Sequence, residues 1–457
     1  MFLYFCISQF SISLKMLWHI FKYYLGFVIA VFFKRTQISN VHNLKVKGPV
    51  ILAMNHPNAF MDPVAISALV YPPRVRYLAR GDAFKKGAAT WVLESLGVIP
   101  IFRMQDGGKE GLLKNDDTYN IVNNLLKRNK KIIIFAEGIC IQERRLRPLK
   151  KGVPRMIFGA MKDSDLKNLT VVPVGVNYQD PSQFRGTVFF NVGEPISIND
   201  YMKQYKEAPA KTMNVFLADL AAKMKSLIVN INYHRSEKVI EHLEIILKYD
   251  FFKSQNLNEN NLEHDFLFST KVVDVINKAE EIIPKKIIEL TEKTSRYFSD
   301  LKKHQFKDWL INPDKQKGIN YFVVILNIFF IILTLPIYVL GLLGNYVPYK
   351  LAYLITSKKV KIKEFKASFY MGIGAMLYLI NYALLFFVPK VLYSGWLGLL
   401  IVIVSFISGY ICLHLSPIRK KTLGMIRILF LKSKNEKKFN DLVHQRAEII
   451  KMYLDLN

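Results

Sequence analysis

Residues 50–63 read VILAMNHPNAFMDP and join an apolar run to a polar turn. The run Val50–Met54 is short and continuously apolar, which indicates a strand buried on both faces. Asn55 and His56 then stand at the carboxyl end of that strand, and Asp62-Pro63 is typical of a helix start. In sheets of parallel strands, polar residues at this end are the first place to look for a site.

The pattern of residues 50–63 recurs through residues 41–200, where short apolar runs alternate with helical stretches. Such alternation predicts an α/β domain with a mainly parallel sheet flanked by helices. Further strands are expected at 98–102, 131–135, 171–176 and 188–192, and helices at 64–70, 84–95, 117–129 and 152–162.

The composition favours a membrane protein with an anionic partner. The chain has 457 residues, of which 51% are hydrophobic, and 64 Lys+Arg against 36 Asp+Glu give a formal charge of +28. Such an excess attracts anionic lipid headgroups, phosphorylated substrates or nucleic acid. Long apolar runs favour the first two, and the sequence carries no nucleic-acid-binding signature. The 3 cysteines form neither a disulfide framework nor a metal-binding spacing, which fits a reducing cytoplasm.

Membrane segments are expected at both ends of the chain. Residues 1–40 should form an N-terminal anchor, because 16–33 are apolar with aromatic residues that suit the headgroup level; a spanning helix is the alternative.

Two further regions are polar. Residues 201–318 should form a helical subdomain, and 416–457 should form a basic cytoplasmic tail.

The region 319–415 contains three apolar runs of spanning length, at 321–343, 368–388 and 392–415. Basic residues flank the runs on several sides, which conflicts with three simple spans under the positive-inside rule. Two arrangements therefore remain open: three straight spans, or a re-entrant hairpin at 321–356 followed by a helical hairpin at 368–415.

The pair His56 and Asp62 suits general-base catalysis on a hydroxyl group. Histidine titrates near neutral pH, and a carboxylate on its far ring nitrogen fixes the tautomer and stabilises the imidazolium. Five residues separate the two, so the chain must turn back at Pro57-Asn58 to pair them. The plainer alternative is that Asp62 only caps the following helix.

The segment Asn55-His56-x5-Asp62 resembles the first block of the glycerolipid acyltransferase family, which includes the lysophosphatidic acid and glycerol-3-phosphate (PlsC-like) acyltransferases. The five-residue spacing looks like the yeast-type glycerol-3-phosphate/dihydroxyacetone-phosphate branch. Three later blocks resemble the family's in the same order: Gly97–Arg103, Phe135–Gly138 and Val172–Val176. Ala136 replaces the usual Pro, and Ile139-Cys140 replace the usual hydroxyl-bearing residues.

The resemblance implies roles for the residues in these blocks. His56 and Asp62 would be catalytic, and Pro173 would lie on the acyl-donor side. The residues implied or considered for binding the phosphorylated acceptor are Arg103, Glu137, Gly138, Arg144 and Arg145. An arginine suits that task because its planar fork of donors matches phosphate.

The resemblance also implies a glycerol-3-phosphate acyltransferase-like fold and activity. The expected enzyme is a membrane-bound O-acyltransferase of phospholipid synthesis that moves an acyl group from acyl-CoA or acyl carrier protein to glycerol 3-phosphate. Its partners would be a phosphorylated glycerol acceptor, an acyl thioester donor and membrane lipids, with no cofactor, metal or nucleic acid, and its site would face the cytoplasm. Acylation of lysophosphatidic acid or a lyso-aminolipid remains an alternative, as does a non-catalytic lipid-binding protein.

Overall fold

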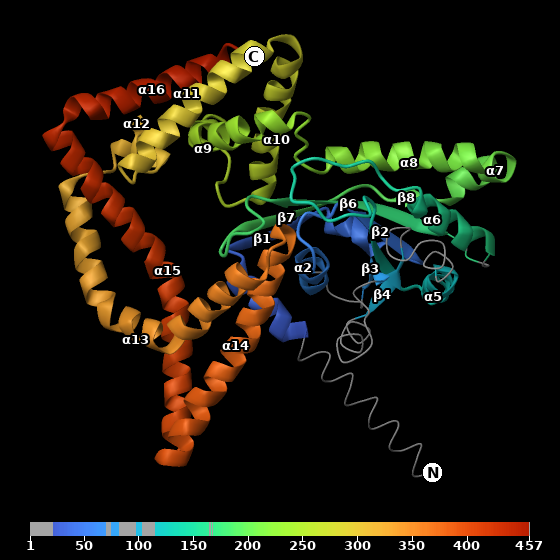
Figure 1. The fold of residues 1–457 in the computed structure, drawn as a ribbon, viewed down its shortest axis with the longest axis horizontal. Coiled ribbons are helices and arrows are strands. Elements are labelled where there is room, and N and C mark those ends of the chain that lie inside the picture. Colours follow the sequence, from blue (N-terminus) through green and yellow to red (C-terminus); the bar gives the residue numbers. More distant parts are fainter. Residues whose placement is uncertain are drawn as a thin grey trace. The chain divides into compact units, whose positions relative to one another are not determined.

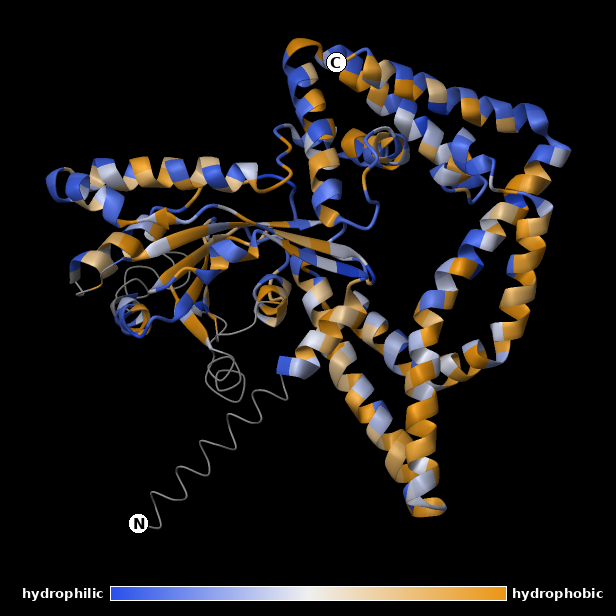
Figure 2. Cartoon of the chain, turned by 180° about the vertical axis from the view of Figure 1, so that it is seen from behind, coloured by the Kyte–Doolittle hydropathy of each residue, from blue (hydrophilic) through white to orange (hydrophobic). Residues whose placement is uncertain are grey.

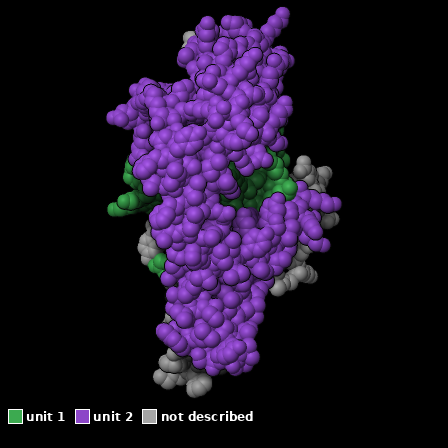
Figure 3. All heavy atoms as spheres, turned by 90° about the vertical axis from the view of Figure 1, so that its left-hand side faces the viewer, with its two compact units in different colours: residues 1–230, 362–368 green, residues 231–361, 369–457 purple. Residues whose placement is uncertain are grey.

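A computed structural model describes residues 22–69, 75–81, 97–102, 115–163, 166 and 168–456 (Figure 1). The expected helix at 84–95 lies outside these residues. The chain divides into two compact units, coloured separately in Figure 3. Unit 1 comprises residues 1–230 and 362–368, and unit 2 comprises 231–361 and 369–457.

Unit 1 is built on an eight-stranded sheet of mostly parallel strands, as expected. Its strands are β1 (Arg35–Ser39), β2 (Val50–Met54), β3 (Arg76–Arg80), β4 (Val98–Ile101), β5 (Lys131–Phe135), β6 (Thr170–Tyr178), β7 (Thr187–Val192) and β8 (Ile196–Ser197). The order across the sheet is β1-β7-β6-β2-β5-β3-β4, with β8 paired to β6. β7 and β8 run antiparallel to β6.

β2 lies in the middle of the sheet, parallel to β5 on one side and to β6 on the other. All its residues are buried, which explains the unbroken apolar run. Because β2, β5 and β6 run in the same direction, their carboxyl ends meet at one edge, and the residues that follow them come together there.

Helices cover both faces of the sheet. α5 (Asn115–Lys127), α6 (Gly152–Asp163) and α8 (Pro209–Ser226) contribute to one hydrophobic core with alternate strand residues such as Ile51 and Ala53. α2 (Met61–Leu69) lies across the opposite face from α8 (Figure 1). α7 (Asn199–Glu207) and α8 belong to unit 1, although the sequence placed them in a separate helical subdomain.

The ends of the sheet domain differ from the expected boundaries. Residues 35–39, predicted to belong to the membrane anchor, form β1 and pair with β7. Upstream of β1 the structure has a short apolar helix, Lys22–Phe32.

The described part of unit 2 consists of helices and the loops that join them. α9 (Glu237–Ser254), α10 (Leu262–Ile282), α11 (Pro284–Lys303) and α12 (Pro313–Gln316) precede three long helices, α13 (Tyr321–Lys359), α14 (Lys363–Leu392) and α15 (Gly395–Lys434). The first residues of α14 belong to unit 1. α16 (Glu436–Leu454) ends the chain.

The helices α13, α14 and α15 are long and apolar enough to cross a membrane (Figure 2). Residues 321–356, for which a re-entrant hairpin was one of two interpretations, lie in the single helix α13, which bends along its length (Figure 1). Pro336 and Pro348 lie inside this helix, where a missing N–H and ring clashes favour bending. The side of the membrane that each end faces stays a prediction.

The region 416–457, expected to be a basic tail, is mostly helical. α15 continues to Lys434, and α16 packs through buried Phe439, Leu442 and Ile449. The guanidinium of Arg446 is also buried and donates to Asp308 at 3.1 Å and to the carbonyl of Ile246 at 2.6 Å. The charged residues on the exposed face of α16 dominate its composition, and the region was therefore interpreted as a basic tail.

Candidate active site

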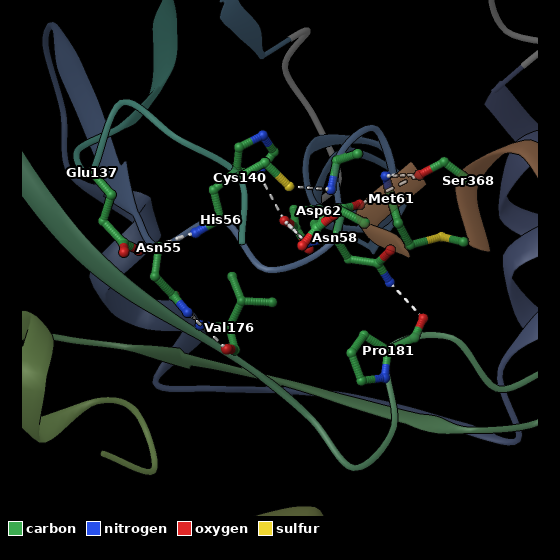
Figure 4. A network of polar contacts seen from close by, with 12 residues as sticks. Asn55, His56, Asn58, Met61, Asp62, Glu137, Cys140, Val176, Pro181 and Ser368 are labelled. Atoms are coloured by element: carbon green, nitrogen blue, oxygen red, sulfur yellow. Dashed lines mark hydrogen bonds and ion pairs between the residues drawn. The ribbon is translucent and has the colours of Figure 1, made fainter. Parts of the chain in front are cut away.

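His56 and Asp62 meet at the carboxyl end of β2. The ring Nδ1 of His56 lies 2.8 Å from Oδ2 of Asp62 (Figure 4). The His56 side chain is 16% exposed and that of Asp62 is fully buried. Because a carboxylate can only accept, Nδ1 carries the hydrogen, and Nε2 is the ring nitrogen that can take a proton from a substrate.

The carboxylate of Asp62 is held by two further donors. The backbone N–H of Asn58 donates to Oδ2 at 2.9 Å, and the hydroxyl of Tyr178 donates to Oδ1 at 2.7 Å. Burial, and then the charge of Asp62, raise the pKa of Tyr178, so this hydroxyl stays a donor. The carboxylate therefore points back to the histidine. Asp62 is the second residue of α2, which begins at Met61, so it does not precede the helix as a cap would.

A buried amide fixes the end of β2. Asn55 accepts from the backbone N–H of Val176 at 2.7 Å and donates to the carbonyl of the same residue at 3.1 Å (Figure 4). These two bonds extend the β2–β6 pairing by one position. His56 therefore leaves the sheet from a defined point.

The turn between His56 and Asp62 is strained, and residues outside it hold it in place. Ala59 has a φ of +36°, a left-handed conformation that costs a non-glycine residue about 1–2 kcal/mol. Its N–H donates to Sγ of Cys140 at 3.1 Å, and the side-chain amide of Asn58 donates to the carbonyl of Pro181 at 2.8 Å. Burial raises the pKa of Cys140, so this sulfur stays a neutral thiol.

Glu137 connects the first and third sequence blocks. Its two carboxylate oxygens accept from the backbone N–H groups of His56 at 3.3 Å and Arg147 at 3.0 Å. Burial, partly offset by these bonds, raises the pKa of Glu137 to about 7. The ring of Phe135, two residues earlier, stacks on His56 with centroids 3.7 Å apart and fixes the imidazole plane. Acceptor binding by Glu137 stays a prediction.

Gly138 forms the turn after β5. Its φ is +63°, and a Cβ there would lie 2.8 Å from the Lys150 side chain. A side chain is therefore disfavoured twice at this position, by its backbone conformation and by its neighbour. The close approach of a substrate to this glycine stays a prediction.

The remaining predicted residues lie in three different settings. Arg145 forms an ion pair with Glu143 at 3.1 Å, and Arg144 is half-buried in the same loop. Pro173 is buried within β6, beside Ala53 of β2. Arg103 lies outside the described residues. Their roles in binding acceptor or donor stay predictions.

The structure brings to the site further residues that were not among the predicted site residues. These are Asn55, Asn58, Tyr178 and Cys140, together with Ser368, whose hydroxyl contacts Met61. Asn55 and Asn58 were inside the quoted block, so their polar character was a usable signal. Tyr178 lies 116 residues from Asp62, and only the β2–β6 pairing brings it near.

Residues 35–177 match the family model described as Acyltransferase. Two related proteins come from Saccharomyces cerevisiae. The chain is 28% identical over 130 residues, 28% of its length, to glycerol-3-phosphate O-acyltransferase 2, and covers 18% of that protein. It is 39% identical over 80 residues, 18% of its length, to glycerol-3-phosphate O-acyltransferase 1, and covers 10% of it. The chain thus spans less than a fifth of the length of these curated relatives.

Among solved structures, the chain is similar to the crystal structure of the 1-acyl-sn-glycerophosphate (LPA) acyltransferase PlsC from Thermotoga maritima. The TM-score is 0.34 at 14% identity, over 48% of this chain and 80% of that one.

The family match ends one residue before Tyr178 and encloses the whole first block, Asn55 to Asp62. It also encloses Arg103, Glu137 and Pro173. Residues 35–177 therefore match the acyltransferase family, and parts of the chain are similar to the glycerol-3-phosphate O-acyltransferases.

Proposed function

We propose that this protein is a membrane-bound O-acyltransferase that moves an acyl group from acyl-CoA or acyl carrier protein to glycerol 3-phosphate in phospholipid synthesis. The observation that carries the proposal is the 2.8 Å contact between His56 Nδ1 and the buried carboxylate of Asp62. A histidine held in this way can act as a general base without a protein nucleophile.

In the proposed reaction, Nε2 of His56 removes the proton from an acceptor hydroxyl as its oxygen attacks the thioester carbonyl. Asp62 stabilises the positive charge that develops on the ring. The tetrahedral intermediate then collapses, the carbon–sulfur bond breaks, and the departing thiolate takes the proton from Nε2. The products are an ester and a free thiol, and the residues return to their starting state without a cofactor or metal.

The acceptor would bind through its phosphate to Arg103 and to the basic loop of Arg144 and Arg145. Glu137 would act mainly through the backbone, because its carboxylate already holds two N–H groups and would repel a phosphate. Pro173 is proposed to lie on the acyl-donor side. These assignments follow the family resemblance; Arg145 is already paired with Glu143 at 3.1 Å, so a bound phosphate would share this arginine with that carboxylate.

The proposed setting is the cytoplasmic surface of a membrane. Three helices of spanning length support insertion, and Lys358, Lys359, Lys363 and Lys366 lie around the connection between α13 and α14. Basic connections favour the cytoplasmic side and attract anionic lipid headgroups. The acceptor and the acyl donor would then both be available at this surface.

The test is acyl transfer by the full-length protein in lipid vesicles, with glycerol 3-phosphate, lysophosphatidate and a lyso-aminolipid offered in parallel. We expect glycerol 3-phosphate to be preferred and His56→Ala to abolish transfer while the protein stays inserted. A preference for either lyso-lipid would replace the acceptor we propose. Equal activity of His56→Ala and wild type would refute the mechanism, and binding of lipid without transfer would favour a non-catalytic role.

A further inference from the structure

The amino end of α14 belongs structurally to the active-site unit. Residues 362–368 fall in unit 1, whereas residues 369–392 of the same helix fall in unit 2. α14 is also one of the three helices long and apolar enough to cross a membrane. One continuous helix therefore connects the candidate site to the membrane region.

Ser368 contacts the turn that joins His56 to Asp62. Its side-chain oxygen accepts from the backbone N–H of Met61 at 3.0 Å and lies 3.4 Å from the carbonyl of Asn58, to which the hydroxyl donates (Figure 4). Ser368 is 8% exposed, so water competes little for these bonds. The same N–H of Met61 also contacts the carbonyl of Asn58, at 2.8 Å.

The Ser368 hydroxyl accepts a hydrogen bond at the start of α2, where a residue close in sequence is the usual acceptor. The first N–H groups of a helix lack partners within the helix, and a nearby Ser, Thr, Asp or Asn usually caps them. At the start of α2 the nearby acid is Asp62, but its oxygens are bound to His56, Asn58 and Tyr178. A serine 307 residues along the chain from Met61 supplies a side-chain acceptor there, and the Met61 N–H is shared between it and the Asn58 carbonyl.

Neighbouring residues of α14 hold the other loop of the site. The carboxylate of Glu364 accepts from the backbone N–H of Gln142 at 3.3 Å, and the Gln142 side chain donates to the carbonyl of Lys363 at 3.4 Å. Phe365 meets Phe60 edge to face with centroids 5.8 Å apart. Gln142 is two residues from Cys140, whose sulfur accepts from the N–H of the strained Ala59, so this segment of α14 contacts both the turn and the loop that supports it.

We infer that Ser368 is a positioning residue, through which the amino end of membrane helix α14 holds the turn 58–61 and thereby the His56–Asp62 pair. The effect on catalysis rests on the proposed function, whereas the docking of α14 on the turn does not. Ser368 contacts Asn58 and Met61, on either side of the strained Ala59, so loss of the hydroxyl should let the turn relax and misplace the base.

The experiment compares Ser368→Ala with Ser368→Thr, which keeps a hydroxyl, in vesicles. The matched control is Ser357→Ala, because Ser357 is exposed and donates only to its own helix, at the carbonyl of Leu354. We expect Ser368→Ala to lower kcat about fivefold to tenfold with KM within twofold of wild type, as for loss of one buried hydrogen bond in the transition-state geometry. Ser368→Thr should recover most of the rate, and Ser357→Ala should match wild type.

Amide hydrogen exchange gives a second measurement that needs no activity. In Ser368→Ala, exchange should rise in a peptide covering residues 57–66 and stay unchanged in a peptide covering β2, which would also show that the variant is folded. Unchanged exchange at 57–66 would overturn the inference even if the wild type transfers acyl groups. An inactive wild type with raised exchange in Ser368→Ala would refute the proposed function and leave the docking supported.

Discussion

Asp62→Asn should lower kcat about 10³-fold while the protein stays folded. In the wild type, Oδ2 accepts from His56 and Asn58, and Oδ1 accepts from Tyr178. An asparagine can keep its oxygen toward the first two and turn its amide toward the tyrosine, whose hydroxyl can rotate to accept. The hydrogen bonds therefore survive, and the lost property is the negative charge.

The size of the effect follows from that charge. The carboxylate and an imidazolium at His56 would have charge centres about 4 Å apart, which corresponds to about 4 kcal/mol at an effective dielectric constant of about 20. The imidazolium exists only while the proton is on the ring, so the loss falls on the transition state and lowers kcat rather than raising KM.

The assay is release of free thiol from an acyl thioester by purified protein in vesicles, at several concentrations of glycerol 3-phosphate. Tyr178→Phe is the matched control, because it removes one hydrogen bond from the same carboxylate and keeps the charge; it should cost only about tenfold or less. A kcat for Asp62→Asn within tenfold of wild type would refute the argument, since the carboxylate would then act only as a hydrogen-bond acceptor.

Two further predictions concern stability. Because the pKa of Glu137 rises from 4.5 when unfolded to about 7 when folded, the folded state binds more protons between these values, and its stability falls as pH rises through that window. The Tm of Glu137→Gln minus the Tm of wild type should therefore increase from pH 5 to pH 7.5. A difference that is independent of pH would contradict this. In unit 2, Arg446→Met should lower the free energy of unfolding by about 3–5 kcal/mol, because it leaves the buried carboxylate of Asp308 without its cation. Thermal unfolding would measure it, and the added change Asp308→Asn should restore part of the loss, whereas no restoration would exclude the unpaired charge as the cause.

The strands that the sequence revealed and those that it did not differ in burial. Val50–Met54 is buried at every position and appears as an uninterrupted apolar run. β1, with the sequence RTQIS, is mostly half-buried, and β3, with the sequence RYLAR, carries arginines at both ends. Strands of this kind lack both the apolar run and the clean alternation on which sequence patterns depend.

The candidate site shows the same limit. The pairing of His56 with Asp62 was predictable because both lie in one short segment with a turn between them. The residues that support the pair, such as Tyr178 and Ser368, come from distant segments, and no local pattern marks them. Asp62 also illustrates competition between two local preferences: a residue suited to capping a helix instead accepts from the histidine, and a remote serine replaces it.

The capping of α2 by Ser368 has a consequence for biosynthesis. The residues that it joins are 307 positions apart, which at 5–20 residues per second corresponds to roughly 15–60 s of translation. Once residue 197 has been made, the growing chain contains His56, Asp62 and the whole sheet, but until residue 368 it lacks the helix that contacts the turn between them. The turn would therefore reach its final geometry only after α14 has been synthesised, and under the proposed function acyl transfer would reach its full rate only then.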